Sequence, residues 1–173
     1  MTRQELVRRI KESAYLEGDF TLRSGRKSKY YLDKYLFETQ PDVLAELGRL
    51  FGERCRPTVT RIAGAELGGV ALAAAASMAT GKPFVIVRNT KKDYGTAKKF
   101  EGQLAPGDVV LLVEDIATTG GQVLEAAKEL VGAGAVIDRI VAVIDRQEGA
   151  RENIEAAGFV FEALLTKADL GIT

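Results

Sequence analysis

The sequence predicts an α/β domain with a mainly parallel central sheet flanked by helices and a small N-terminal cap. Three observations favour this class. From about residue 61 onward, short apolar runs alternate with segments typical of helices. Val109–Val113 is apolar at every position, as in strands that are covered on both faces. Residues 1–60 lack this alternation, so we expect one domain over 1–173, with a cap over about 1–60 and a core over about 61–165.

The cap is predicted to contain two helices and a pair of short strands. Thr2-Arg3-Gln4-Glu5 has the form of a capping box and opens a helix that extends to about Tyr15. Phe20–Leu22 and Tyr30–Leu32 are predicted strands on either side of a turn. Pro41 suits the first turn of a second helix, and apolar spacing extends that helix to about Cys55.

The core is predicted to alternate strands with helices. The expected strands are Arg61–Ala63, Phe84–Val87, Val109–Val113, Ile137–Ile144 and Val160–Leu165. The expected helices are an Ala-rich helix ending at Thr80, then Gly121–Gly132 and Ala150–Ala157. Ligands of such sheets bind beyond the carboxyl ends of the strands. We therefore expect a site built from the loops Gly64–Gly69, Arg88–Gly102 and Glu114–Gln122, together with Arg146.

Composition excludes several classes of function. The 173 residues include 24 basic and 24 acidic side chains, so the net charge is zero and a nucleic-acid partner is not expected. There is no histidine, which excludes every mechanism that uses this residue. A single cysteine, Cys55, forms no internal disulfide and no zinc cluster.

The same sequence predicts a cytoplasmic protein without a membrane partner. The segment Met1–Lys11 is charged throughout and has no apolar signal core. The longest apolar stretch, Gly68–Ala79, is about half the roughly 20 residues that a membrane span needs. One unpaired cysteine suits a reducing compartment.

Two short basic patches stand out against this neutral background. Residues 23–34 and 88–99 each contain five basic side chains against one acidic side chain. The patches favour a small anionic ligand, and the alternative is that both are solvated loops.

The strongest signal is the string Val109-Val110-Leu111-Leu112-Val113-Glu114-Asp115-Ile116-Ala117-Thr118-Thr119-Gly120-Gly121-Gln122. A buried strand ends in two carboxylates, and two hydroxyls and two glycines precede a helix. Free N–H groups at a helix N-terminus suit a phosphate. The acids suit a neutral diol or a divalent metal. The string therefore indicates a sugar phosphate, with the acids on ribose hydroxyls and the amides on the 5-phosphate.

Neither of the commoner nucleotide loops is present. The sequence lacks Gly-x-x-x-x-Gly-Lys-Ser/Thr, which argues against a P-loop kinase or NTPase, and it lacks the dinucleotide pattern Gly-x-Gly-x-x-Gly. The remaining alternative for Thr118–Gly121 is an ordinary threonine N-cap with a Gly-rich turn.

Four segments in order carry a resemblance to a known family. The string 109–122 resembles the phosphoribosyl-pyrophosphate signature of the type I phosphoribosyltransferases. Residues 20–28, Lys92-Asp93-Tyr94-Gly95 and Ile144-Asp145-Arg146-Gln147-Glu148 resemble segments of the orotate phosphoribosyltransferases within that group. The resemblance covers nearly the whole chain.

The resemblance implies an enzyme of pyrimidine biosynthesis. It would transfer the 5-phosphoribosyl group of phosphoribosyl pyrophosphate (PRPP) to N1 of orotate, giving orotidine 5′-monophosphate and pyrophosphate. Mg²⁺ is the implied cofactor, bound mainly through the substrate and without dedicated protein ligands. The implied partners are PRPP, orotate and a second copy of the chain, with the Arg88–Gly102 loop shared across the two subunits of a homodimer.

The resemblance also implies roles for individual residues. The catalytic residues would be Lys92, Glu114 and Asp115. PRPP would contact Arg88, Lys92, Tyr94, Glu114, Asp115, Ile116, Ala117, Thr118, Thr119, Gly120, Gly121 and Gln122. Orotate would contact Thr118, Arg146 and Arg23, with the planar guanidinium of Arg146 facing the carboxylate. Pyrophosphate would lie on a loop of Ala65, Glu66, Leu67 and Gly68, which in this superfamily often carries a non-proline cis bond.

The chain departs from the family at four positions. Asn89 and Gly68 stand where lysine is frequent, Tyr94 stands where histidine is frequent, and Arg23 replaces a usual lysine. Two rivals remain at this stage. One is a purine or uracil phosphoribosyltransferase, which would not require Arg146. The other is a non-catalytic regulator on the same fold, although Thr2–Tyr15 predicts one helix and not a helix-turn-helix.

Overall fold

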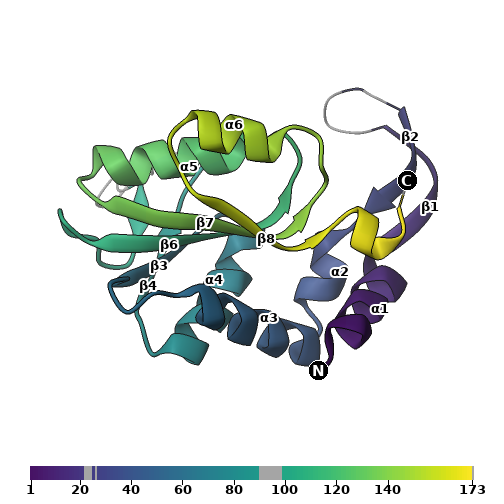
Figure 1. The fold of residues 1–173 in the computed structure, drawn as a ribbon, viewed down its shortest axis with the longest axis horizontal. Helices are drawn as coiled ribbons and strands as arrows, with labels where there is room; N and C mark the ends of the chain where they lie inside the picture. The colour runs from purple at the N-terminus through teal and green to yellow at the C-terminus, as the bar shows by residue number, and fades with distance from the viewer. Residues whose placement is uncertain (22–24, 26, 90–98, 173) are drawn as a thin grey trace.

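A six-stranded sheet forms the centre of the molecule (Figure 1), in a computed structural model that describes residues 1–21, 25, 27–89 and 99–172. The strand order is β5-β4-β3-β6-β7-β8. The strands are β3 (Arg61–Ala65), β4 (Phe84–Val87), β5 (Phe100–Glu101), β6 (Val109–Ala117), β7 (Val136–Asp145) and β8 (Phe161–Thr166). All neighbours pair in parallel except β5, which is antiparallel to β4 at the edge. The predicted fold class is therefore confirmed.

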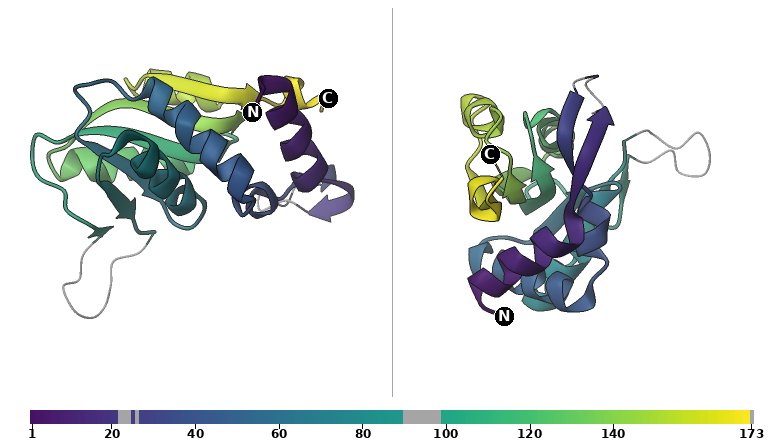
Figure 2. Two further views of the ribbon diagram at one scale, coloured as in Figure 1. Left: turned by 90° about the horizontal axis from the view of Figure 1, so that it is seen from below. Right: turned by 90° about the vertical axis from the view of Figure 1, so that its right-hand side faces the viewer.

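Helices cover both faces of this sheet (Figures 1 and 2). They are α3 (Pro41–Arg54) and α4 (Gly68–Thr80) on one face, and α5 (Gly121–Gly132) and α6 (Ala150–Ala156) on the other. Phe51 and Leu72 belong to the first of two buried clusters, while Leu130 and Ile154 belong to the second. The sheet is thus buried on both sides, as its continuous apolar strands predict.

The N-terminal elements lie together at one end of the sheet (Figure 2). They are α1 (Arg3–Ala14), the antiparallel hairpin of β1 (Tyr15–Thr21) and β2 (Lys27–Leu32), and α2 (Lys34–Glu38). The side chain of Thr2 accepts a hydrogen bond from the backbone N–H of Glu5, so the predicted helix start is confirmed. Leu6 and Ile10 of α1 join the same buried cluster as α3 and α4.

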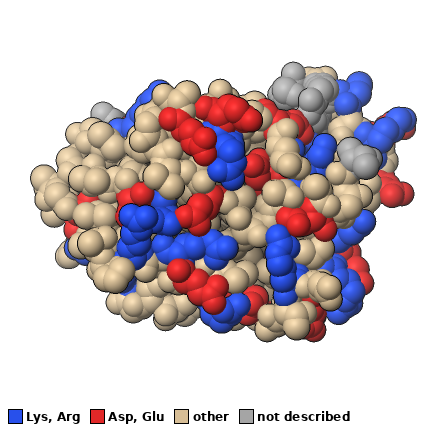
Figure 3. Space-filling model, in the orientation of Figure 1, with Lys and Arg blue, Asp and Glu red and all other residues tan. Residues whose placement is uncertain are grey.

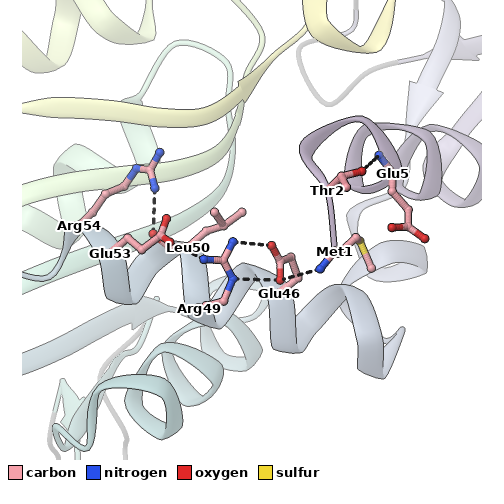
Figure 4. A network of polar contacts seen from close by, with 8 residues as sticks. All are labelled: Met1, Thr2, Glu5, Glu46, Arg49, Leu50, Glu53 and Arg54. Carbon is pink, nitrogen blue, oxygen red and sulfur yellow. Dashed lines mark hydrogen bonds and ion pairs between the residues drawn. The ribbon is translucent and has the colours of Figure 1, made fainter.

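A chain of polar contacts holds the N-terminus against α3 (Figure 4). The N-terminal ammonium lies 3.6 Å from Glu46 Oε2, and Arg49 Nη2 lies 2.6 Å from the other oxygen, Glu46 Oε1. Arg49 contacts Glu53 in turn, and Arg54 donates to the carbonyl of Leu50 at 2.9 Å. Arg3 of α1 contacts Asp169 at 3.1 Å, in the short 3₁₀ helix η1 (Ala168–Leu170).

The structure differs from the sequence prediction at several elements, and the edge strand β5 and the short helix η1 were not predicted at all. The strand predicted to end at Val113 continues to Ala117, because the parallel pairing of β6 with β7 persists as far as Ala117, which pairs with Asp145. The β1–β2 hairpin is longer than its apolar positions indicate, because backbone pairing extends it through exposed residues. The helix α2 was not predicted; its N-cap is Asp33, whose carboxylate accepts from the N–H of Tyr35.

Acidic and basic side chains are interspersed on the face seen in Figure 3, in keeping with the zero net charge. Within the described part of the chain, no helix combines the length and the apolar character that crossing a membrane requires.

Candidate active site

A cavity of about 650 Å³ lies where the carboxyl ends of the central strands meet the N-terminal elements. Its lining brings together nearly all of the loop that the sequence singled out and two regions far from it. The lining residues are Glu114–Val123 and Arg146, with Tyr31, Leu32, Lys34 and Glu148.

One end of this cavity is formed by the turn between β6 and α5, where the sequence predicts a phosphate site. Gly120 is the N-cap residue of α5 and has a φ of 79°, a left-handed conformation that glycine adopts without strain. No described side chain caps α5, so its first N–H groups are available to a ligand. Asn153 donates to the carbonyl of Thr119 at 2.9 Å and ties the turn to α6. The turn is therefore held by its hydrogen bond to α6, and the N–H groups at the start of α5 are left for an anion.

The acid pair lies next to this turn, near the carboxyl end of β6. Glu114 and Asp115 are both buried, and the N–H of Asp115 donates to Glu114 Oε1 at 3.1 Å. The Lys34 Nζ lies 2.6 Å from Asp115 Oδ2. Burial raises the pKa of Glu114 well above its usual range, and the nearby Asp115 carboxylate raises it further. The two carboxyl groups are thus buried side by side, and burial disfavours the ionised form of Glu114.

A third carboxyl group, Glu38, faces the acid pair from α2. Only 2% of Glu38 is exposed, and its Oε1 has no hydrogen-bond partner among the described residues. Burial, followed by the charge of Asp115, raises the pKa of Glu38 to about 8. For Lys34, burial opposes the ammonium form, but Asp115 outweighs it and the pKa is raised. The cluster therefore combines three carboxyl groups with one ammonium group, that of Lys34, whose charged form is favoured by Asp115.

Arg146 forms a second wall of the cavity, immediately after β7. Its Nη2 lies 2.9 Å from the Tyr30 hydroxyl and 3.0 Å from Glu148 Oε1, and its guanidinium carbon stands 5.3 Å from the centre of the Tyr30 ring. The side chain is buried, yet Nε has no acceptor within the described part of the chain. The main-chain N–H of Arg146 donates to Ala117 at 2.9 Å, which fixes the residue against the end of β6.

The predicted pyrophosphate loop lies between β3 and α4. The Glu66–Leu67 peptide bond is cis, as the resemblance led us to expect. Asn89 donates from its N–H to Glu66 Oε1 at 2.6 Å, and from its side chain to the Glu66 carbonyl at 3.1 Å. A Cβ atom at Gly68 would stand 3.1 Å from Lys34 Nζ and would collide with the carboxylate of Asp115. The Lys34 ammonium therefore lies beside the position where the family frequently has a lysine of its own.

A neighbouring cavity of about 760 Å³ is lined by two of the predicted residues that the first one lacks, whereas Glu66, Leu67 and Gly68 line neither cavity. Arg88 and Ala65 line it, together with Asn89 and Lys99, and Gln122 lines both cavities. Arg88 lies 3.6 Å from Glu101, and Lys99 lies 3.6 Å from Glu129. Arg23, Lys92 and Tyr94 lie outside the described residues.

Several residues at the site were missed by the sequence analysis. Lys34 belongs to the basic segment 23–34, and Tyr30 and Tyr31 belong to a predicted strand, but none of the three was assigned to the site. Glu148 stands in the segment that carries the resemblance, without a role of its own. Glu38 carried no signal, because its proximity to the site depends on how distant elements pack. In the described ranges, no three His, Cys, Asp or Glu side chains come together as a metal site.

Comparisons with known proteins agree with this geometry. The phosphoribosyl transferase domain family matches residues 36–169. An orotate phosphoribosyltransferase of Natronomonas pharaonis is 42% identical over 98% of both chains. The crystal structure of the Mycobacterium tuberculosis orotate phosphoribosyltransferase in complex with Fe(III) dicitrate superposes with a TM-score of 0.88, at 32% identity over 98% of this chain and 99% of that one. The same enzyme in complex with PRPP gives a TM-score of 0.83, at 32% identity and the same coverage.

A parallel sheet with a sugar-phosphate loop at its carboxyl edge defines a phosphoribosyltransferase, and the family match covers most of the chain. Within that class, the chain belongs to the orotate phosphoribosyltransferase family.

Proposed function

We propose that the cavity carries out the reaction of this family, the reversible transfer of the 5-phosphoribosyl group of PRPP to N1 of orotate. The products are orotidine 5′-monophosphate and pyrophosphate, and the step belongs to pyrimidine biosynthesis. The observation that carries the proposal is that one cavity joins the sugar-phosphate loop to a buried arginine with an unpartnered Nε. A phosphoribosyltransferase whose nucleobase substrate carries no negative charge would not need that arginine.

The 5-phosphate would bind at the start of α5. The uncapped N–H groups that follow Gly120 point to an anion, and the hydroxyls of Thr118 and Thr119 add donors. The backbone of Ile116 and Ala117 leads into this turn, and Gly121 and Gln122 complete it. Glu114 and Asp115 would hold the ribose hydroxyls, because carboxyl oxygens accept hydrogen bonds from a diol and both residues line the cavity.

Orotate would bind between Arg146 and Thr118. The guanidinium forms parallel hydrogen bonds with a carboxylate, and Tyr30 and Glu148 fix its orientation. Arg23 is proposed to line the same side from the sequence resemblance. The pyrophosphate would lie on the backbone of Ala65–Gly68, near Arg88, with Lys92 and Tyr94 contributed by the Arg88–Gly102 segment.

The chemical step needs charge stabilisation more than proton transfer. The bond from ribose C1 to the pyrophosphate oxygen breaks and a bond from C1 to orotate N1 forms, with the electron pair leaving on pyrophosphate. Orotate attacks as an anion, so no protein base is required, in keeping with a chain without histidine. Lys92 and Arg88 would stabilise the growing negative charge of the leaving group.

The donor set fits Mg²⁺ that arrives with the substrate. Glu114 and Asp115 are the carboxyl groups at the ribose position, and one or two carboxylates with substrate oxygens are a common Mg²⁺ environment. When bound, Mg²⁺ would neutralise charge on the pyrophosphate.

We further propose a homodimer in which the Arg88–Gly102 segment of each subunit reaches the neighbouring site. The resemblance supports this arrangement. The proposal places the reaction in the cytoplasm, because one free cysteine, Cys55, suits a reducing compartment.

The test follows the ultraviolet absorbance of orotate with purified protein, PRPP and Mg²⁺. We expect a loss of orotate absorbance that requires both PRPP and Mg²⁺. Adenine, guanine and uracil serve as control bases and should remain unchanged. Conversion of a control base in place of orotate, or no conversion of any base while PRPP binds, would contradict the proposed function.

A further inference from the structure

Lys34 lies at the boundary between the N-terminal elements and the sheet. It is the first residue of α2, and α2 begins at the Asp33 cap directly after β2. About 30% of its side chain is exposed, and its Nζ reaches a carboxylate of β6 that is almost fully buried. The side chain therefore crosses from the cap into the cavity that holds the sugar-phosphate loop.

The cavity has few positive charges for the ligand proposed to occupy it. Among the described residues that line it, the cations are Lys34 and Arg146, against Glu114, Asp115 and Glu148. Arg146 is already paired with Glu148. A substrate with a 5-phosphate and a diphosphate carries several negative charges, so each nearby cation matters. Lys34 is the cation that stands beside the ribose-binding acids.

The position of the ammonium relative to Gly68 is the second observation. The Lys34 Nζ lies 3.1 Å from where a Cβ of Gly68 would be, so the ammonium adjoins the end of the proposed pyrophosphate loop. It also lies 2.6 Å from Asp115, the proposed ribose ligand. One ammonium thus adjoins the two places that the ribose and the diphosphate of PRPP would occupy.

We propose that Lys34 is a diphosphate-binding residue, which pairs with Asp115 in the free protein and turns to the diphosphate when PRPP binds. The inference rests on the proposed function. The ribose hydroxyls donate to Asp115 as the ammonium leaves it, so the buried carboxylate always has a donor. The ammonium exchanges one anionic partner for another, which keeps it from being left buried without a counter-charge.

The test compares two ligands that differ only in the diphosphate. Binding of PRPP and of ribose 5-phosphate is measured by calorimetry with Mg²⁺ for the wild type and for Lys34→Met. We expect the variant to bind PRPP roughly tenfold to a hundredfold more weakly, as for a lost hydrogen bond between charged groups. Ribose 5-phosphate should bind as well as before or more tightly, because Asp115 Oδ2 has lost its ammonium partner and is open to a ribose hydroxyl.

The matched control is Lys29→Met. Lys29 is a lysine of the neighbouring strand β2 that also pairs with an aspartate, Asp19, but both partners are exposed. This control should leave both affinities unchanged. If Lys34→Met fails to fold, Lys34→Gln keeps a donor for Asp115 without the charge, and the same difference between the two ligands is expected.

Equal weakening of both ligands would overturn the inference, since Lys34 would then only support Asp115. Unchanged PRPP affinity would overturn it as well. The proposed function fails by a different result, the lack of orotate conversion by the wild type, so the two failures are distinguishable.

Discussion

Hydrogen bonds to neighbouring residues orient the guanidinium of Arg146, the residue proposed to bind the carboxylate of orotate. Tyr30 and Glu148 both contact its Nη2, its main-chain N–H is bonded to Ala117, and Nε remains without an acceptor in the described part of the chain. A buried donor without an acceptor is costly unless a ligand completes it. The proposed orotate carboxylate would supply the acceptor that Nε lacks.

We predict that Arg146→Ala raises the KM for orotate roughly tenfold to a hundredfold and changes the KM for PRPP much less. The reason is that the guanidinium would contact only the base. Steady-state kinetics with each substrate varied in turn would measure the difference. Arg8→Ala, which removes an exposed arginine of α1 paired with Glu12, is the control and should change neither value. Equal losses for both substrates would contradict the assignment.

The buried Glu38 makes a prediction about pH. Its pKa is raised from 4.5 to about 8, so the folded protein binds a proton there that the unfolded chain has lost. The contribution of this proton to stability is complete below about pH 4.5 and is lost as the pH rises toward 8, at up to about 1.4 kcal/mol per pH unit.

Glu38→Gln should therefore flatten part of the decline in Tm between pH 5 and 8, and should raise the Tm at pH 8. Thermal unfolding at a series of pH values measures this. Glu12→Gln on the exposed face of α1 should reproduce the wild-type profile. A wild-type Tm that rises with pH over this range, with Glu38→Gln parallel to it, would show that Glu38 is ionised.

At the scale of residues, the sequence predicts site residues that are adjacent in the chain. It misses those that folding brings together from distant segments. Glu114, Asp115 and the following turn are adjacent in the chain, so their types and order indicate a sugar-phosphate loop. Lys34 and Glu38 reach the same cluster from the cap. Their contribution depends on the packing of α2, a helix too short to show an apolar period.

At the scale of elements, two glycines of α3 control its distance from α4. A Cβ at Gly48 would stand 2.6 Å from the carbonyl oxygen of Ala75, whereas a Cβ at Gly52 would find its nearest atom at 3.5 Å, in Thr80. The first distance is too short for a real contact and the second is ordinary. The two helices therefore touch at Gly48 and diverge slightly by Gly52.

We predict opposite effects for the same substitution at these positions. Gly48→Ala should lower the free energy of unfolding by about 1–3 kcal/mol, because a methyl group has no room between the backbones. Gly52→Ala should raise it by about 0.5–1 kcal/mol, because alanine favours a helix interior. Denaturant unfolding of both variants gives the comparison. A stabilised Gly48→Ala would mean that α3 and α4 are farther apart.

Element boundaries were predictable where apolar runs end at a turn and less so where pairing continues. The helix Gly121–Gly132 and the strand Phe84–Val87 have the bounds that their sequences indicate. The strand β6 runs four residues beyond Val113, because hydrogen bonds to β7 hold charged residues in the ladder. A sequence pattern shows which side chains are apolar, whereas the end of a strand is set by where its backbone hydrogen bonds to the neighbouring strand end.

For the whole molecule, the class was predictable and the strand order was not. Alternation of strands and helices indicates a parallel sheet. The order β5-β4-β3-β6-β7-β8, with its antiparallel edge, depends on which strands meet in space. That order brings the carboxyl ends of β3, β6 and β7 to the N-terminal elements, so the site exists only in the assembled fold.

The proposed homodimer gives a prediction at this scale. If Lys92 acts in the neighbouring site, a Lys92→Ala subunit and an Asp115→Asn subunit contain complementary defects. Each variant alone should have little activity. Mixing equal amounts under conditions of subunit exchange should restore about a quarter of the wild-type activity, since half of the dimers then contain one intact site.

Mixing without exchange is the control and should restore nothing. Sedimentation should give twice the mass of one chain. No recovery after demonstrated exchange would mean that each site uses its own Lys92.

The stacking around Tyr30 has a practical consequence. The chain contains no tryptophan and five tyrosines, and four of them, Tyr15, Tyr30, Tyr31 and Tyr35, lie in the cap. Tyr30 stacks on Tyr15 with ring centres 5.7 Å apart, and its hydroxyl accepts a hydrogen bond from Arg146 Nη2 at 2.9 Å. Tyr31 lines the proposed substrate cavity itself. One tyrosine of the cavity wall and one that contacts Arg146 in that wall therefore contribute to the ultraviolet emission of the protein. We expect a ligand in the cavity to change this emission without an added dye or a mutation.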